Sequence, residues 1–549
     1  MTIIELNSSA DSSFPSLQDC DVCIIGSGPA GSTIARELSN SGLRVTLLES
    51  GQQQRCNDAD RLDDIESVGR QRASDQWAVR NRILGGSSHT WGGRCAPFDA
   101  IDFEPRSWIE RSGWPFDLHH ITPYLDRSAG HLGLAYGSGY NDEAFWNLAG
   151  KKPPTESLDS SKLLPFFWQF SRDSKESYPF EYMRFGRHLV EQVGNNVSIV
   201  TGATVSQIRL REDGERVDRV DFFARNGERR SVRASFVILC AGGIENARIL
   251  LNSDSPNSRG IGNDRDQVGR YLMDHLRGPV ASFSVKGTAS LQRRFGRYNV
   301  HGHLFRAGFR LSPEVQKQER LLNCAAWLGE VFAEDDPWIS LRRVLSRERK
   351  TAADFRNILS NSAFIVRGLK EYFLDKNGVP RKLKALNLEC MVEQLPDPDS
   401  RIRLSDKKDR FGKRLPQLDW RVHAEESHTM RRMAHLTVEQ FARLRLPAPE
   451  LEPWVLDNAE MPATFVDVAH PTGTTRMSNN RSEGVVDSDS RVHGIGGLYI
   501  CGSSVFPTAG HCNPTQMIVA MAIRLADHVK SKSNSSPPEL VTVNAEAAN

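Results

Sequence analysis

The sequence predicts an α/β protein in which a doubly wound, Rossmann-like domain is interleaved with a second domain that contains a sheet of its own. Three observations support this prediction. A glycine-rich strand–turn–helix–strand segment occupies residues 22–51. Sequence patterns typical of alternating strands and helices occur again near residues 197–275 and 467–530. The segments between them also contain strand-like and helical patterns, but in an arrangement that differs from that of the three α/β segments. A chain of 549 residues is also too long for one hydrophobic core, so two or more domains are expected.

The segment at residues 22–51 has the pattern of a dinucleotide-binding turn. Two short apolar runs, Val22–Ile25 and Val45–Leu48, predict strands, and the text between them predicts a helix that ends near Asn40. The first glycine of the turn allows a sharp bend, the second lets backbone N–H groups approach a pyrophosphate, and the third lets the helix pack on the strand. The helix N-terminus adds partial positive charge. The turn residues are Gly26, Ser27, Gly28, Pro29, Ala30 and Gly31.

An acidic residue, Glu49, ends the second strand and is followed by Ser50. A carboxylate at this position can accept hydrogen bonds from ribose hydroxyls, and it disfavours a ribose that carries a phosphate. Glycines alone are weak evidence because they punctuate many loops, but here both strands and the acid are present. The segment therefore predicts a site for FAD or NAD rather than NADP.

Composition and charge argue against several classes of function. The formal net charge of +2 gives no electrostatic reason to expect a nucleic-acid partner. The N-terminus lacks the basic and apolar regions of a secretory signal, and no stretch is apolar enough for a transmembrane segment, so we expect a cytoplasmic protein. The nine scattered cysteines indicate neither a disulfide framework nor a metal site.

Changes in composition and in the pattern of predicted strands and helices indicate the domain boundaries that we expect. Polar tails are predicted at residues 1–18 and 531–549. A discontinuous dinucleotide-binding domain and a second domain with linking segments share the rest of the chain. The first takes residues 19–105, 195–275 and 465–530, and the second takes residues 106–194 and 276–464.

Further motifs follow the glycine turn along the chain. They are RILGGSSHTWGG from Arg82, LCAGGIENARILLNS from Leu239, RYLMDH from Arg270, HPTGTTRM from His470 and GLYICGSSVFPTAGHCNPTQMIVAMAIRLADHV from Gly497. In this order, from Asp21 to Lys530, the sequence resembles the glucose–methanol–choline (GMC) family of FAD-dependent oxidoreductases, in its His–Asn active-site variant. The resemblance implies FAD as cofactor, a doubly wound FAD-binding domain, and a substrate domain built on a mostly antiparallel sheet with helices.

The glycine- and serine-rich loop at residues 84–93 could be a plain surface loop, but its free N–H groups can also bind a pyrophosphate or a flavin. The resemblance places this loop along the isoalloxazine ring. It also places Thr90 where some relatives attach FAD covalently through a histidine, and His89 lies one residue early, so we expect non-covalent FAD. The loop residues expected at the cofactor are Gly85, Gly86, Ser87, Ser88, His89, Trp91, Gly92 and Gly93.

Other cofactor contacts are implied by the resemblance alone. Val205 would meet the adenine through its backbone, although it could also be an ordinary strand valine. The turn that contains Ala241 and Gly242 would lie beside the FAD phosphates, although it could also be a simple strand-to-helix connection. The remaining positions are Gly502, Ser503, Asn513, Pro514 and Thr515.

The resemblance makes His470 and Asn513 the expected catalytic pair. Asn513 can cap the helix predicted after it, and Pro514 suits the first turn of that helix. A neutral histidine can accept the hydroxyl proton of an alcohol while hydride passes to flavin N5 and the asparagine holds the substrate oxygen. His511 is a further candidate for the same pocket.

These features predict FAD-dependent oxidation of an alcohol to a carbonyl by an oxidase or a dehydrogenase, with oxygen or another electron acceptor. A weaker resemblance favours a sugar, glycoside, polyol or secondary-metabolite hydroxyl as the substrate. The alternative is a GMC-fold lyase, or another flavoprotein without net redox chemistry.

Overall fold

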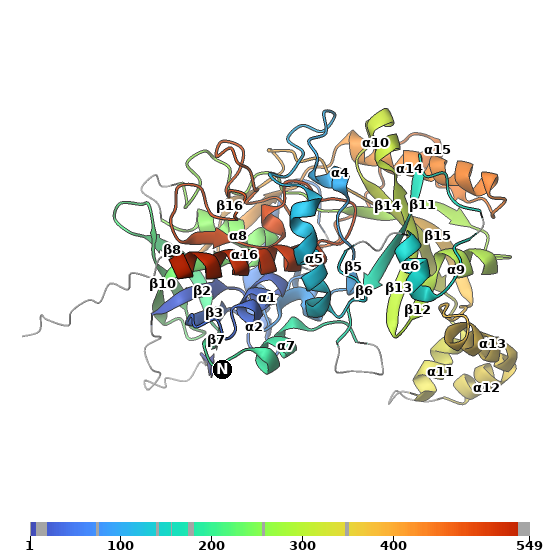
Figure 1. The fold of residues 1–549 in the computed structure, drawn as a ribbon, viewed down its shortest axis with the longest axis horizontal. Coiled ribbons are helices and arrows are strands. Elements are labelled where there is room, and N and C mark those ends of the chain that lie inside the picture. The colour runs from blue at the N-terminus through green and yellow to red at the C-terminus, as the bar shows by residue number, and fades with distance from the viewer. Residues whose placement is uncertain are drawn as a thin grey trace, which may run out of the picture.

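The computed structural model of the protein describes residues 2–6, 19–72, 76–138, 142–154, 156–173, 181–254, 259–345 and 351–535. Figure 1 shows two halves side by side, each built around a sheet. The sheet at the left holds the N-terminal strands, and the sheet at the right holds strands from the middle of the chain. Among the described residues, no helix is both long and apolar enough to cross a membrane.

The left-hand sheet is mainly parallel, in the order β1–β7–β3–β2–β10, with β19 also paired to β10. Its strands β2 and β3 are buried along their whole length, as expected where helices cover both faces. The first half of β10 continues into an antiparallel meander with β9 and β8. The bounds are β1 (Thr2–Glu5), β7 (Val197–Thr201), β3 (Val45–Glu49), β2 (Cys20–Ile25), β10 (Arg229–Leu239), β19 (Leu498–Ile500), β9 (Val217–Phe223) and β8 (Thr204–Leu210).

Helices from distant parts of the chain cover this sheet (Figure 1). The C-terminal helix α16 (Thr515–Ser535) packs against α1 (Pro29–Glu37) and α5 (Leu118–Leu132), and α1 also contacts α7 (Phe185–Gln192). Helix α8 (Gly242–Leu251) follows β10 directly. The doubly wound architecture predicted from the sequence is therefore confirmed.

The right-hand sheet is antiparallel, in the order β18–β11–β15–β14–β13–β6–β5, with β12 paired to β13. The predicted antiparallel sheet of the second domain is thus confirmed. The bounds are β18 (Glu450–Leu451), β11 (Leu276–Phe283), β15 (Leu383–Val392), β14 (Cys324–Phe332), β13 (His303–Leu311), β6 (Leu163–Phe170), β5 (Arg94–Cys95) and β12 (Arg297–Val300).

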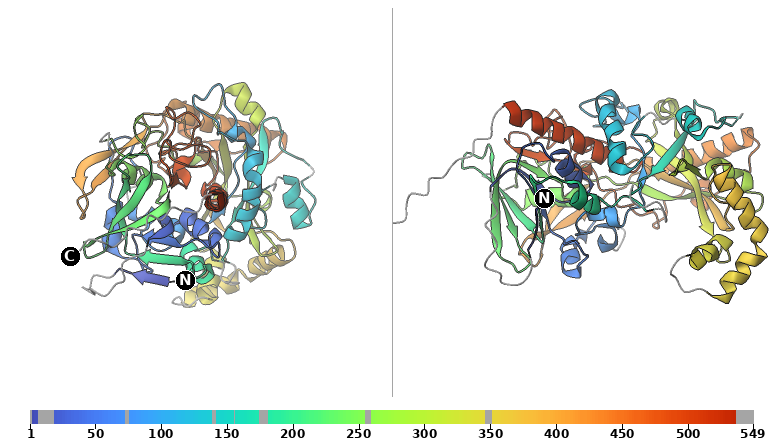
Figure 2. Two further views of the ribbon diagram at one scale, coloured as in Figure 1. Left: turned by 60° about the vertical axis from the view of Figure 1, so that its left-hand side comes forward. Right: turned by 60° about the horizontal axis from the view of Figure 1, so that its bottom comes forward.

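Helices α14 (Ala424–Arg443) and α9 (Ala289–Phe295) pack on the antiparallel sheet. Phe441 of α14 stacks on Phe295 of α9 with ring centroids 5.3 Å apart, which links the two helices. Figure 2 shows a helical lobe that extends from the end of this domain and is formed by α11 (Pro337–Leu345), α12 (Ala352–Ser360) and α13 (Ser362–Phe373).

A third, small sheet of β16, β17 and β4 packs against α8. The remaining elements are short. The bounds are β16 (Arg401–Lys408), β17 (Arg414–Asp419), β4 (Glu66–Ser67), α2 (Asn57–Asp60), α3 (Gln76–Val79), α4 (Ala100–Phe103), α6 (Asp142–Ala149), α10 (Pro313–Glu319) and α15 (Pro453–Leu456), with 3-10 helices η1 (Arg61–Asp63), η2 (Gly86–His89) and η3 (Ser503–Val505).

Several elements belong to a different part of the structure from the one that the predicted domain boundaries assign to them. Strand β1 lies inside the predicted N-terminal tail, because residues 2–5 pair in parallel with β7. Strand β5 was placed in the first domain but pairs with β6 of the second. Conversely, α5, α7, β16 and β17 pack on the first domain although they come from stretches assigned to the second. Helix α16 continues through residue 535, and the rest of both predicted tails lies outside the described residues.

Candidate active site

A cavity of about 530 Å³ runs between the parallel sheet and the antiparallel sheet. The glycine turn after β2, the glycine loop at residues 86–94 and the start of α8 line it from the first half. Strand residues of the second half and the turn at residues 468–471 complete the wall.

The glycine turn has the geometry that a close-approaching ligand requires. Gly26 has a φ of +97°, and a Cβ there would lie 2.8 Å from the carbonyl oxygen of Cys240, so no larger residue fits. A Cβ on Gly28 would meet nothing within 4 Å, because this residue faces the cavity. Gly31 does not line the cavity, and a Cβ there would lie 1.9 Å from the Gly26 carbonyl oxygen. The first turn of α1 contains no acidic residue, so its positive end is free for an anion.

Glu49 lines the cavity and also organises the turn. Its carboxylate accepts hydrogen bonds from the backbone N–H (2.9 Å) and hydroxyl (2.6 Å) of Ser27 and from the backbone N–H of Gly51 (2.8 Å). The Ser27 hydroxyl in turn accepts a hydrogen bond from the backbone N–H of Gly85 at 2.9 Å. A single carboxylate therefore joins the first glycine turn to the second glycine loop.

The second glycine loop lies against the first. A Cβ on Gly86 would come within 3.0 Å of the Gly28 Cα, and both residues line the cavity. His89 and Gly85, expected at the cofactor, do not line the cavity; the exposed His89 ring is bound through Nε2 to the carbonyl oxygen of Leu84 at 3.0 Å. Thr90 faces the cavity instead. The predicted loop residues that do line it are Gly86, Ser87, Ser88, Trp91, Gly92 and Gly93.

The far end of the cavity holds the remaining predicted cofactor positions. Val205 lines it at the start of β8, and Phe223 and Phe411 stack nearby with ring centroids 4.8 Å apart. Gly242 has a φ of +88° and no neighbour within 4 Å of a Cβ, so the N-terminus of α8 opens into the same space. No sequence motif pointed to Phe411, because this residue reaches the cavity from the small third sheet, between β16 and β17. Further predicted residues in the lining are Pro29, Ala30, Ser50, Ala241, Gly502, Ser503, Pro514 and Thr515.

His470 and Asn513, the expected catalytic pair, lie together at the cavity wall. The His470 Nε2 atom is 3.3 Å from the Asn513 Nδ2 atom. The Asn513 Oδ1 atom is buried and has no hydrogen-bond partner among the described residues. A buried acceptor without a partner is rare in a folded protein and is typical of a site that a ligand completes.

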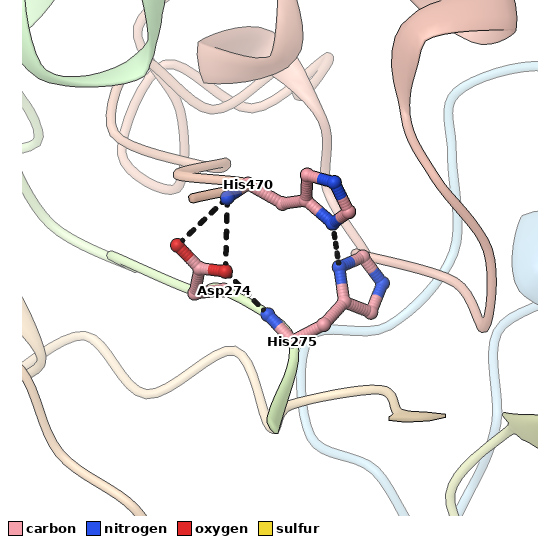
Figure 3. Close-up of side chains that lie close together, drawn as sticks. All are labelled: Asp274, His275 and His470. Carbon is pink, nitrogen blue, oxygen red and sulfur yellow. Dashed lines mark hydrogen bonds between the residues drawn. The ribbon is translucent and has the colours of Figure 1, made fainter. Parts of the chain in front are cut away.

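A second histidine, His275, determines which nitrogen of His470 carries the proton. The His275 Nε2 atom lies 3.0 Å from the carbonyl oxygen of Gly510, and a carbonyl can only accept, so Nε2 carries the proton. The Nδ1 atom of neutral His275 is then an acceptor, and it lies 3.1 Å from the His470 Nδ1 atom (Figure 3). His470 therefore donates from Nδ1 and presents an unprotonated Nε2 to Asn513.

Asp274 holds the backbone of this histidine pair in place. Its carboxylate accepts from the backbone N–H groups of His275 (2.8 Å) and His470 (3.0 Å), as Figure 3 shows. The Arg72 guanidinium, itself buried, pairs with Asp274 at 2.5 Å and with Asp467 at 2.9 Å. The motif RYLMDH contains Asp274 and His275, so a signal for both was present, although the sequence did not show their roles.

Burial and positive neighbours both favour neutral imidazoles in this pair. Burial lowers the pKa of His470 well below 6.5, and the neighbouring His275, Arg94 and Arg72 lower it further. Burial also lowers the pKa of His275, against the opposing effect of Asp274. At neutral pH, His470 is thus an unprotonated base rather than a cation.

His511, the further pocket candidate, is not brought to the cavity. Its ring is fully buried on the other side of the loop, with Nδ1 3.1 Å from the Asn323 Nδ2 atom and 3.6 Å from carboxylate oxygens of Asp99 and Asp102. Phe166 packs on it at a centroid distance of 4.8 Å. Asn513, two residues later in the chain, lines the cavity, whereas His511 is enclosed by the protein interior.

The cavity therefore combines a glycine cradle, the open N-termini of α1 and α8, and an imidazole–amide pair. The glycine turn has no room for a Cβ at Gly26 or Gly31, and the Glu49 carboxylate lies beside it. This arrangement fits a dinucleotide. The class of protein that the fold and this site define is a flavin-dependent oxidoreductase.

Comparison with known proteins agrees. Two models of the GMC oxidoreductase family match residues 186–277 and 396–522, and an FAD binding domain model matches residues 19–57. The chain is therefore similar to the GMC oxidoreductase family over these two segments, and to an FAD binding domain over the segment that contains the first glycine turn.

Two distant relatives match over nearly the whole chain. The 2-methyl-1,2-propanediol dehydrogenase of Mycolicibacterium austroafricanum is 22% identical over 97% of this chain and 99% of its own length. The paromamine 6'-oxidase of Streptomyces fradiae is 24% identical over 93% of this chain and 91% of its own. Among solved structures, pyridoxine 4-oxidase from Mesorbium loti has a TM-score of 0.56 at 18% identity, covering 93% of this chain and 99% of the other, which shows the shared fold.

Proposed function

We propose that this protein oxidises a CH–OH group of a small molecule to a carbonyl, with FAD as the oxidant. One observation carries the proposal: an imidazole whose free Nε2 lies 3.3 Å from an amide N–H donor, at the wall of a cavity built for FAD. An alcohol needs a base for its hydroxyl proton and a donor for its oxygen, and this pair offers both.

The residues that would hold FAD are those of the cradle. The N-terminus of α1 at Gly28 suits the pyrophosphate, Glu49 the ribose hydroxyls and Val205 the adenine. Bound FAD supplies the acceptor for the two electrons that leave the alcohol carbon. No histidine faces the cavity from the second glycine loop, which supports non-covalent attachment.

His470 takes the hydroxyl proton at Nε2 in this proposal, while its Nδ1–H remains bonded to His275. Asn513 donates a hydrogen bond from Nδ2 to the substrate oxygen and so fixes its position. Since α16 begins at Thr515, directly after this asparagine, the partial positive charge of its N-terminus favours negative charge that develops nearby. A general base of this kind contributes roughly 10²- to 10⁴-fold to the rate.

The names of similar proteins suggest which class of alcohol is the substrate. They act, by name, on a propanediol, on paromamine and on C-glycosides. We accordingly propose a polyol, sugar, glycoside or secondary-metabolite hydroxyl, with oxygen or another molecule as the electron acceptor.

Anaerobic mixing of the FAD-loaded protein with a panel of alcohols and sugars tests the proposal. Redox chemistry bleaches the yellow flavin absorbance near its visible maximum, and later admission of oxygen distinguishes an oxidase from a dehydrogenase. A substrate that is converted while the flavin stays coloured would contradict the proposal and favour a lyase.

A further inference from the structure

The end of the cavity near His470 has an arginine that the catalytic scheme does not use. Arg94 lies on the edge strand β5 and lines the cavity together with Arg277, Trp327 and Met391 from the antiparallel sheet. The Arg94 guanidinium carbon lies 5.0 Å from the Trp327 ring centroid, and that of Arg277 lies at the same distance from this ring. Two cations therefore flank one indole in the wall of the cavity.

The two arginines differ in their partners. Arg277 is paired with Glu389 at 3.1 Å, so its charge is already compensated. In the described part of the chain, the Arg94 guanidinium has neither an ion-pair partner nor a hydrogen-bond partner. No acidic residue of the described chain lines this end of the cavity, because the acidic lining residues Glu49, Asp63, Glu245 and Asp409 all lie at the glycine-turn or adenine end.

An uncompensated cation in this place is costly. Burial, and then the neighbouring Arg306, Arg277 and Arg297, lower the pKa of Arg94 to about 9, which still leaves it charged at neutral pH. Half-buried charges without a partner are rare unless a ligand or another charge completes them. The stacking on Trp327 offsets part of this cost but leaves all the N–H donors of the guanidinium unused.

We propose that Arg94 binds a carboxylate of the substrate, so that the alcohol which this enzyme oxidises is a hydroxy acid such as an acidic sugar or a polyol acid. This inference rests on the proposed function, because the hydroxyl of the same molecule must reach His470 and Asn513. The carboxylate stays unchanged, and the oxidation removes one O–H proton and the two electrons and hydrogen of one C–H bond, which FAD accepts.

Charge balance favours a carboxylate over a phosphate. One uncompensated guanidinium neutralises one negative charge, and its planar fork matches the two oxygens of a carboxylate. A phosphate monoester carries close to two charges at neutral pH and would leave one of them unpaired here. The indole of Trp327 can pack against the apolar face of the carbon chain between the two groups.

Binding is tested first, apart from turnover. The FAD-loaded protein is titrated under anaerobic conditions with propanoate, propanamide and inorganic phosphate, and both calorimetric heat and flavin absorbance are recorded. Propanoate is expected to bind at least about 10-fold more tightly than propanamide, and the Arg94→Gln variant is expected to lose that preference, whereas Arg94→Lys keeps part of it.

Turnover is tested second, with hydroxy acids and their primary amides as matched pairs. The acid is expected to have the higher kcat/KM, and Arg94→Gln is expected to lower kcat/KM for the acid roughly 10- to 100-fold, mainly through KM, with little change for the amide. If Arg94→Gln fails to fold, the acid–amide comparison in the unaltered enzyme and in Arg94→Lys still decides.

Each outcome is decisive. Equal binding of propanoate and propanamide, tighter binding of phosphate, or an equal loss for acids and amides in Arg94→Gln would overturn the inference. Flavin reduction by neutral alcohols alone would overturn it while the proposed function stands. Carboxylate binding that depends on Arg94, without flavin reduction by any hydroxyl compound, would overturn the proposed function and with it the assignment of the carboxylate to a substrate.

Discussion

Replacing His275 with methionine tests whether this residue sets the proton position on His470. The change keeps side-chain volume similar but removes the acceptor for the His470 Nδ1–H, which lies 3.1 Å away in a fully buried environment. His470 must then either leave a buried donor unpaired or move its proton to Nε2. In the second form the nitrogen that faces Asn513 can no longer accept a proton.

The structure bounds the size of the effect. A buried donor without a partner costs about 1–3 kcal/mol, which corresponds to a roughly 5- to 150-fold lower population of the reactive tautomer. The rate constant for flavin reduction at saturating substrate should fall by a factor in this range. The FAD content should not change, because His275 does not line the cavity.

The assay is anaerobic stopped-flow reduction of the flavin, with His275→Gln as the matched control. A glutamine can accept from His470 through Oε1 and donate to the carbonyl oxygen of Gly510 through Nε2, so it should retain most of the rate. A normal rate in His275→Met would refute the assignment of the tautomer. Equal losses in both variants would show that shape, not hydrogen bonding, is what His275 contributes.

Three further predictions follow from the same geometry. Acid denaturation should release FAD into the supernatant, and flavin that stays with the precipitated chain would contradict non-covalent binding. Gly26→Ala should lower FAD content and destabilise the fold by more than about 1 kcal/mol, because φ is +97° and the new Cβ meets the Cys240 carbonyl oxygen. Gly42→Ala, with φ of +82° but no neighbour within 4 Å, is the control and should retain FAD. Because the pKa of His470 is depressed, kcat/KM should fall with decreasing pH only below 6.5, and an acidic limb above that value would contradict a buried neutral base.

Local sequence signals were sufficient where the structure is set by neighbouring residues. The pattern around the glycine turn predicted two strands and a helix correctly, because the glycines there are required by the backbone geometry of the turn itself. Strand β1 was missed because four residues in a polar context give too short an apolar pattern, and only pairing with β7, almost 200 residues later in the chain, makes it a strand.

The site likewise contains residues that local motifs predicted and residues whose roles depend on distant segments. His470 and Asn513 lie in motifs, and the structure brings them together as expected. His275 and Arg94 lie in or beside motifs, but their roles depend on partners from other segments, such as Gly510 and Trp327. No spacing within one segment predicts such contacts, because the packing of segments that are far apart in the chain decides which side chains meet.

The most direct test of the account is flavin reduction in the His470→Ala variant, compared with His493→Ala, whose histidine lies outside the cavity and binds the carbonyl oxygen of Ser478. The account predicts that both variants retain FAD, that His470→Ala reduces it at least about 100-fold more slowly than the unaltered enzyme, and that His493→Ala reduces it normally. An unchanged rate in His470→Ala would contradict it.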